Sequence, residues 1–246
     1  MSVSSSFAPD WLTPPADAND LVPGVWPSSA SRSATGEVEI AGIPVSDLAR
    51  TYGTPLYVVD EDEVRARARA ARTAFDAAAS AHGTTAHVYY AGKALLTTEV
   101  ARWVTEEGLA LDVCSAGELA VALAAGVDPR RLGYHGNNKS AGEITRAVEV
   151  GVASIIIDSD VEIERVATAA TAAGVVQSVR LRVNSGVHAE THDFLATAHE
   201  DQKFGFTLSQ APAAVARIRA HASLDFGGLH CHIGSQIFGT AGFRES

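Results

Sequence analysis

Short apolar runs alternate with longer segments of helical character along most of the chain. Apolar runs with a strand-like pattern are centred near residues 88, 111, 132, 155, 181 and 229. The segments between them predict helices over residues 97–107, 116–125, 141–150, 161–173 and 209–221. Such alternation is typical of parallel strands that are joined by right-handed crossovers. The pattern therefore predicts an α/β fold.

The spacing of the strands favours a (β/α)8 barrel, of the TIM-like kind, over a doubly wound open sheet. Consecutive strand centres lie roughly 21 to 26 residues apart, except for the last interval of about 48 residues. An open sheet that binds a dinucleotide needs a glycine-rich turn after its first strand. The corresponding segment here, residues 91–96, holds a single glycine, Gly92. Six strand units precede Ser246 and a closed barrel needs eight, so we expect an incomplete barrel.

The first sixty residues have a different pattern. Residues 1–36 are rich in Ser, Pro, Ala and Gly without a clear period, which predicts an irregular arm. Residues 38–43 and 55–59 predict short strands, and residues 45–52 predict a short helix between them. The Ala- and Arg-rich segment over residues 61–82 has high helix propensity. We therefore expect the barrel part to cover residues 60–246.

Polar residues stand at the carboxyl ends of the predicted strands. Alternation along the fifth strand places Val179, Leu181 and Val183 on one face, which leaves Arg180 and Arg182 on the other. An arginine is too costly to bury without an anionic partner. Active sites of barrels lie at the carboxyl ends of the strands. We therefore expect one convergent rim, which consists of Lys93, Asp112, His135, Asp158, Arg182 and His232.

Lys93 has the most definite chemistry of these residues. It follows the apolar strand near residue 88, and apolar surroundings favour the uncharged form of a lysine amine. An uncharged amine can attack a carbonyl group and form a Schiff base. The alternative is an ordinary lysine whose stem covers apolar surface while its ammonium group reaches water.

Other members of the rim also have structural explanations. Asp112 and Asp158 are candidates for capping the helices that follow them. His135 and His230 are candidates for core histidines with satisfied hydrogen bonds. The convergence of the whole set is therefore a stronger indication of function than any single member.

The composition of the chain indicates in which compartment and with which partners we expect the protein. A net charge of −10 and an isoelectric point near 5.3 repel nucleic acid and anionic membranes. The apolar runs fall far short of the roughly 20 residues that a membrane-spanning helix needs. The N-terminus lacks the features of a secretory signal, and Cys114 and Cys231, expected to be small buried hydrophobic residues, offer no disulfide framework. We expect a cytoplasmic protein without nucleic acid or membrane partners.

A long polar segment before the last strand contains three histidines, His188, His192 and His199. The first two have the spacing of a zinc-binding helix, but Glu190 stands midway between them. Zinc proteases place this glutamate directly after the first histidine or directly before the second. We therefore expect no metal site, and a long loop at a barrel mouth instead favours a substrate site or a subunit contact.

Six motifs along the chain carry a family resemblance that extends from about residue 37 to the end. They are Tyr90-Ala91-Gly92-Lys93-Ala94, Leu111-Asp112-Val113-Cys114-Ser115-Ala116-Gly117-Glu118-Leu119, His135-Gly136-Asn137-Asn138-Lys139-Ser140, Arg182-Val183-Asn184, Lys203-Phe204-Gly205-Phe206 and His230-Cys231-His232-Ile233-Gly234-Ser235-Gln236. As an ordered set they resemble the pyridoxal-phosphate-dependent decarboxylases with an alanine-racemase-type barrel, and among these the diaminopimelate decarboxylases. The resemblance implies that fold and that cofactor.

The resemblance also implies roles for individual residues. Lys93 is similar to the lysine that forms a Schiff base with pyridoxal 5'-phosphate, and is the predicted catalytic residue. His232 resembles the histidine that stacks on the pyridine ring, and Ser235 resembles a serine that helps to hold the phosphate. Asp112 and Arg182 resemble polar residues around the cofactor. These five are the predicted cofactor-binding residues.

The implied reaction is the decarboxylation of meso-2,6-diaminopimelate to L-lysine, in lysine biosynthesis, by a cytoplasmic homodimer. The alternatives are a decarboxylase of ornithine or arginine, because these motifs define cofactor chemistry more than substrate choice, and a non-catalytic pyridoxal-phosphate-binding homologue. Family members continue beyond the last motif, so we expect this sequence alone to be inactive. The resemblance further implies that residues 37–59 contribute strands to a second β domain whose remainder lies outside this sequence.

Overall fold

The computed structural model describes residues 17–186, 204–235, 237 and 239–246. The chain divides into two compact units, residues 1–66 and 67–246, with the boundary inside helix α2 (Glu61–Ala81). Each unit is described separately below.

The first unit contains a small antiparallel sheet. Strand β1 (Ala30–Arg32) pairs with β2 (Val38–Ile40), and β2 pairs with β3 (Ile43–Pro44). Helix α1 (Val45–Tyr52) follows directly and ends at Gly53, whose φ of 81° suits a glycine. From residue 17 on, where the unit is described, it thus consists of three short strands, one short helix and the start of α2.

Two expectations for this unit are wrong. Residues 55–59 form no strand, although their apolar pattern predicts one. Tyr57 is 97% exposed and Val58 is 48% exposed, so these side chains lack the neighbouring sheet that would bury them and pair their backbone. Residues 30–32, expected within an irregular arm, instead form β1, because β2 provides the partner that a local pattern does not reveal.

The second unit contains a parallel sheet that follows chain order. Its main path runs β10-β8-β7-β6-β5-β4, and β9 pairs with β8 on the side. The strands are β4 (Tyr89–Ala91), β5 (Ala110–Val113), β6 (Leu132–Tyr134), β7 (Ser154–Ile157), β8 (Gln177–Asn184), β9 (Phe206–Thr207) and β10 (Leu224–Cys231). A doubly wound sheet reverses its strand order, and this sheet does not. The arrangement is that of a partial (β/α)8 barrel, as predicted.

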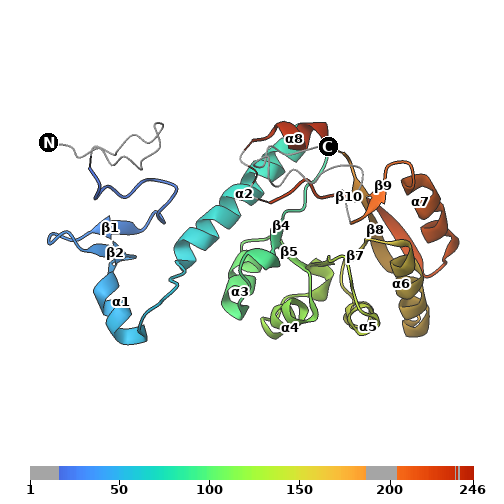
Figure 1. Ribbon diagram of the computed structural model, residues 1–246, viewed down its shortest axis with the longest axis horizontal. Coiled ribbons are helices and arrows are strands. Elements are labelled where there is room, and N and C mark those ends of the chain that lie inside the picture. The colour runs from blue at the N-terminus through green and yellow to red at the C-terminus, as the bar shows by residue number, and fades with distance from the viewer. Residues whose placement is uncertain (1–16, 187–203, 236, 238) are drawn as a thin grey trace, which may run out of the picture. The chain divides into compact units, whose positions relative to one another are not determined.

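Helices follow the strands and line one side of the sheet (Figure 1). They are α3 (Thr98–Glu106), α4 (Ala116–Ala124), α5 (Ala141–Val150), α6 (Asp160–Ala173) and α7 (Ala211–Ala220). A short helix α8 (Ala241–Glu245) near the end of the sequence does not belong to this row. Short 3-10 turns occupy Gly92–Ala94 and Pro129–Arg131. The five predicted barrel helices are confirmed to within two residues at each end.

The core lies between this sheet and its helices. Leu111, Leu132, Ile155 and Leu181, one from each of four adjacent strands, are fully buried. Each such side chain stabilises the fold by about 1.5–3 kcal/mol relative to exposure. Along β8 buried and more exposed residues alternate, as predicted. The apolar face of the sheet is thus used for packing, and the other face carries polar groups.

Among the described residues, no helix combines the length and the apolar character that crossing a membrane requires.

Candidate functional site

Lys93 lies immediately after β4, in the 3-10 turn Gly92–Ala94, and is exposed. The turn is held by the Tyr90 hydroxyl, which donates a hydrogen bond of 2.9 Å to the Leu95 carbonyl oxygen. At Gly92 a Cβ atom would lie 2.7 Å from the main-chain oxygen of Asp112, so only glycine fits there. The apolar surroundings expected for Lys93 are not found, because Lys93 is exposed in the turn that follows the strand.

Asp112 and His135 form a polar pair on neighbouring strands. The Asp112 Oδ1 atom lies 2.9 Å from Nε2 of His135, and both side chains are largely shielded from solvent. Gly133 permits this approach, because a Cβ atom there would lie 2.6 Å from Asp112 Oδ1. The following helix is capped by Ser115, whose hydroxyl accepts from the Glu118 amide. Asp112 is therefore not a helix cap.

His230 joins this pair from β10. The rings of His135 and His230 meet edge to face, with centroids 5.0 Å apart and planes inclined by 73°. Burial, followed by the positive charge of His135, lowers the pKa of His230 to about 3. Its Nδ1 atom is buried and has no hydrogen-bond partner in the described structure. At neutral pH His230 is thus an uncharged ring with one polar atom unsatisfied.

Arg182 has the anionic partner that its position on the sheet demands. Its Nη1 atom lies 3.1 Å from Oδ1 of Asp158, whose side chain is only 4% exposed. The Arg182 Cζ atom also lies 5.5 Å from the ring centre of Phe204. Gly205, with φ of 80°, packs against the backbone and stem of Arg182. The guanidinium group is therefore held between Asp158 and the Phe204–Gly205 segment.

His232 follows β10 and connects these groups electrostatically. Desolvation of the ring lowers the pKa of His232, and the positive charges of Lys93, Arg182 and His135 lower it further. Lys93, Arg182 and His135 thus lie near enough to His232 to affect its charge, and the assignment of these residues to a cofactor site stays a prediction. Ser235 is exposed in the loop beyond His232, and within the described residues it makes no hydrogen bond to the other predicted site residues.

Three glutamates escaped the sequence prediction although they organise this end of the barrel. Glu118 accepts from the Cys114 amide at 2.6 Å, and Glu162 accepts from the Asp158 amide at 2.8 Å. Glu143 completes a capping box with Ser140. The signal that identifies them is a Ser-X-X-Glu sequence after three successive strands, at residues 115–118, 140–143 and 159–162.

The two cysteines, Cys114 and Cys231, are both partly buried and free. Cys114 is partly buried, and desolvation raises the pKa of its thiol. Cys231 is also partly buried, with its Sγ atom 3.3 Å from the Ser185 hydroxyl. No group of three His, Cys, Asp or Glu residues suited to a metal occurs in the part of the chain that is described. The histidines of the polar segment, His188, His192 and His199, lie outside it.

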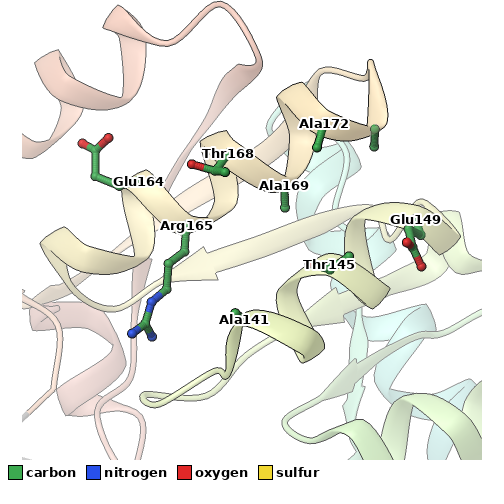
Figure 2. Close-up of a pocket in the computed structure, with 9 residues that line it drawn as sticks. Ala141, Thr145, Glu149, Glu164, Arg165, Thr168, Ala169 and Ala172 are labelled. Atoms are coloured by element: carbon green, nitrogen blue, oxygen red, sulfur yellow. The ribbon is translucent and has the colours of Figure 1, made fainter.

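A groove of about 440 Å³ runs between α5 and α6 (Figure 2). It is lined largely by small side chains of the two helices, among them Ala141, Thr168 and Ala172. None of the predicted site residues reaches it. The groove is thus separate from the rim, which combines an amine, a guanidinium group, carboxylates and imidazoles.

Comparison with known proteins identifies relatives of this chain. Residues 61–246 match the family described as "Pyridoxal-dependent decarboxylase, pyridoxal binding domain". The chain is 53% identical over 226 residues to the diaminopimelate decarboxylase of Mycobacterium tuberculosis, covering 91% of this chain and 49% of that protein. It is 52% identical over 238 residues to the enzyme of Mycobacterium leprae, covering 96% and 49%. The chain spans about half the length of these curated relatives.

Solved structures agree with this similarity. The crystal structure of diaminopimelate decarboxylase from M. jannaschii matches with a TM-score of 0.80 and 29% identity, over 89% of this chain and 51% of that one. The same enzyme in co-complex with L-lysine matches with a TM-score of 0.79 and 29% identity, with the same coverage. The lysine decarboxylase of Selenomonas ruminantium matches with a TM-score of 0.66 and 27% identity, over 82% and 48%.

Proposed function

Since the chain belongs to the pyridoxal-dependent decarboxylase family and carries its pyridoxal-binding domain, we propose that it supplies the cofactor site of an enzyme that decarboxylates meso-2,6-diaminopimelate to L-lysine. The observation that carries this proposal is the rim that joins Lys93, Arg182 and His232, in a chain about half identical to diaminopimelate decarboxylases. The proposal includes a homodimeric assembly and a cytoplasmic location.

The groups at the rim fit pyridoxal 5'-phosphate. An anionic cofactor with an aldehyde needs an amine and a cationic donor, which Lys93 and Arg182 provide, and His232 adds an imidazole ring whose lowered pKa favours its neutral form. The exposed position of Lys93 leaves its amine accessible to an aldehyde. The buried Nδ1 of His230 provides a further polar atom whose hydrogen-bonding capacity is unused by the described residues.

We propose that the five residues predicted from the sequence bind the cofactor. Lys93 would bind the aldehyde carbon through its amine, and His232 would lie beside the ring. Arg182, Asp112 and Ser235 would provide polar contacts. When bound, pyridoxal phosphate supplies an electron-accepting ring that stabilises the charge left on the substrate after CO₂ departs.

The remaining chemistry comes from the chain itself. Asp158 compensates the charge of Arg182, so that this guanidinium group can stay partly buried next to the site. Asp112 orients the His135 ring by the contact to Nε2. His230 stays neutral at physiological pH and adds no positive charge to a site that already holds Lys93 and Arg182.

The assignment of Lys93 is tested by chemical trapping. Full-length protein is incubated with pyridoxal 5'-phosphate and reduced with borohydride, and the three lysines of this sequence, Lys93, Lys139 and Lys203, are compared by peptide mapping. We expect the adduct on Lys93 alone. Lys93→Ala should abolish the adduct and reduce CO₂ release from meso-2,6-diaminopimelate to below about one per cent, since the amine that binds the cofactor aldehyde is lost.

Lys203→Ala is the matched control and should keep both the adduct and the activity. An adduct on Lys139, or normal CO₂ release by Lys93→Ala, would contradict the assignment. Faster release of CO₂ from ornithine or arginine than from meso-2,6-diaminopimelate would contradict the proposed substrate while leaving the cofactor assignment in place. Trapping without CO₂ release from any of these amino acids would indicate a non-catalytic homologue.

A further inference from the structure

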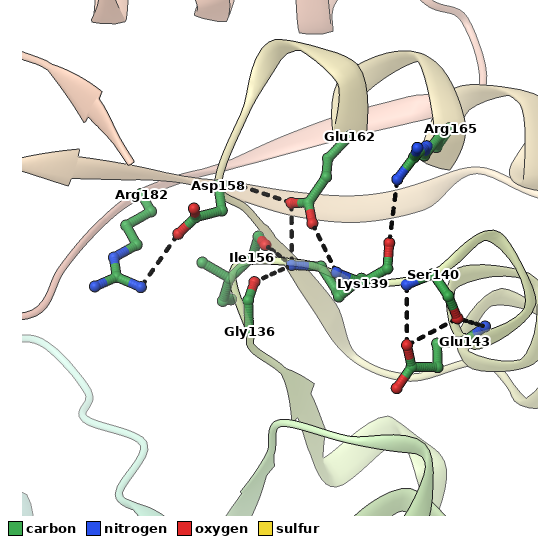
Figure 3. Close-up of polar contacts among 9 residues, drawn as sticks. All are labelled: Gly136, Lys139, Ser140, Glu143, Ile156, Asp158, Glu162, Arg165 and Arg182. Carbon is green, nitrogen blue, oxygen red and sulfur yellow. Dashed lines mark hydrogen bonds and ion pairs between the residues drawn. The ribbon is translucent and has the colours of Figure 1, made fainter. Parts of the chain in front are cut away.

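A buried ion pair lies behind the rim, between two neighbouring strand-to-helix loops. Lys139 follows β6 in the loop before α5, and Glu162 lies in the first turn of α6. Their Nζ and Oε2 atoms are 3.0 Å apart, and their side chains are only 1% and 3% exposed (Figure 3). Because both side chains are buried, this ion pair is not an ordinary surface salt bridge.

Lys139 also ties the ends of two strands together. Its ammonium group donates to the Gly136 carbonyl oxygen and, at 2.8 Å, to the Ile156 carbonyl oxygen. Gly136 belongs to the loop after β6, and Ile156 belongs to β7. Burial lowers the pKa of Lys139, an effect that the nearby Glu162 carboxylate opposes. The ammonium group of Lys139 thus holds the loop after β6 against strand β7.

Glu162 connects this buried ion pair to Asp158 at the rim. Its Oε2 atom accepts a hydrogen bond of 2.8 Å from the Asp158 amide, the first residue after β7. The Asp158 carboxylate in turn contacts Arg182 at 3.1 Å on β8 (Figure 3). A continuous chain of polar contacts therefore leads from Lys139 through Glu162 and Asp158 to the guanidinium group of Arg182.

We propose that Glu162 is a positioning residue that holds Asp158, and through it Arg182, in the place that cofactor binding requires, while Lys139 compensates the buried charge of Glu162. The inference deepens the proposed function and rests on it, because it concerns the affinity of the same rim for pyridoxal 5'-phosphate. The side chains of Lys139 and Glu162 are both buried, so we expect them to act on the cofactor site through Asp158 and not by direct contact with the cofactor.

A purely stabilising role explains these contacts less well. Buried ion pairs contribute little net stability, and apolar residues of similar size often replace them at no cost. What apolar residues cannot replace is the acceptor for the Asp158 amide, which fixes the start of the loop that carries the Asp158 carboxylate. The two roles therefore make different predictions for paired substitutions.

The test compares two double variants of the full-length protein. Lys139→Met with Glu162→Gln removes both charges but keeps an amide oxygen that can accept from the Asp158 amide. Lys139→Met with Glu162→Met removes both charges and that acceptor as well. The dissociation constant for pyridoxal 5'-phosphate is measured by absorbance titration, and thermal unfolding is followed in parallel.

We expect the Met/Gln variant to bind within about threefold of the unchanged protein, and the Met/Met variant to bind at least about tenfold more weakly, as for other residues that orient a binding group. Gln177→Leu is the control. Gln177 is a buried residue that donates to the Val152 carbonyl oxygen from the opposite end of β8, and its loss should lower stability without changing the affinity.

Equal dissociation constants for the two double variants would overturn the inference. If the Met/Met variant does not fold, Asp158→Ser tests the same chain of contacts directly, and an affinity equal to that of the unchanged protein would overturn it too. Failure of the unchanged protein to bind pyridoxal 5'-phosphate would instead remove the proposed function, and the inference with it.

Discussion

At the scale of single residues, the charge of a side chain and its place in the alternation along a strand identify the site better than the burial of that side chain does. Alternation along β8 places Arg182 on the polar face, and the carboxylate it needs is Asp158. His135 and His230 have a candidate explanation as isolated core histidines, yet they contact each other, and His135 also pairs with Asp112. Local sequence gives the face on which a side chain lies, but a contact between strands depends on the register of the sheet.

The lowered pKa of His230 predicts an acid-sensitive fold. Since its folded-state pKa of about 3 lies below the ordinary value of 6.5, protonation favours the unfolded state. The contribution of neutral His230 to the free energy of unfolding is fully present above pH 6.5 and is lost as the pH falls towards 3. Between pH 7.5 and 5.0 the loss should be about 2 kcal/mol, and His230→Gln should remove that loss.

Urea unfolding of the cofactor-free protein at pH 7.5 and pH 5.0 checks this. The exposed His82 provides a control, because His82→Gln changes no buried group and should leave the pH dependence as it is. A pH dependence that is the same in His230→Gln and in the unchanged protein would show that His230 is not its source.

At the scale of elements, helix starts are the most regular feature of the barrel part. Ser115 and Ser140 cap α4 and α5 through their hydroxyl groups, and a glutamate three residues later bonds back to the backbone in each loop. These local signals explain why the predicted helix bounds agree with the structure. Strand β9 (Phe206–Thr207) was missed because two residues carry no period, and pairing with β8 alone defines it.

Glu143 tests the strength of these loop contacts. It accepts from the Ser140 amide and also binds the Ala116 amide and the Tyr134 hydroxyl group, so it joins α5 to the start of α4. Glu143→Ala removes the capping box and leaves the buried Tyr134 hydroxyl unpaired. The free energy of unfolding should fall by about 2 kcal/mol.

Chemical denaturation measures this change, with Glu149→Ala as the control. Glu149 is an exposed residue of the same helix, and its removal should alter stability by less than about 0.5 kcal/mol. If both variants lose the same stability, the contacts of Glu143 between the loops contribute nothing beyond helix propensity.

At the scale of the whole molecule, the order of the strands decides the architecture. Neighbours in the sheet are neighbours in the chain from β4 to β8, which the regular spacing of the apolar runs predicts. Within the described sheet, β4 and β10 form the two ends of the main path. An exposed strand edge is a template for pairing with another chain.

We therefore expect the chain of 246 residues to self-associate when it is expressed alone. Leu229 on β10 is 56% exposed, and Leu229→Lys should reduce association because a charge opposes edge pairing. Val161→Lys provides a control at nearly equal exposure, 57%, on α6. Size-exclusion chromatography with light scattering measures the mass. A monomer that melts cooperatively would contradict the expectation.

The sequence by itself determined the period of the strands and helices, the polar face of β8 and the motifs that surround Lys93 and His232. These features are local, because side-chain alternation and helix caps depend on a few neighbouring residues. Only the tertiary structure decided that residues 55–59 form no strand and that Lys93 is exposed. It also decided that Lys139 and Glu162 are buried behind the rim. The reason is that burial and pairing depend on which segments distant in the sequence become neighbours, and a local pattern carries no information on that.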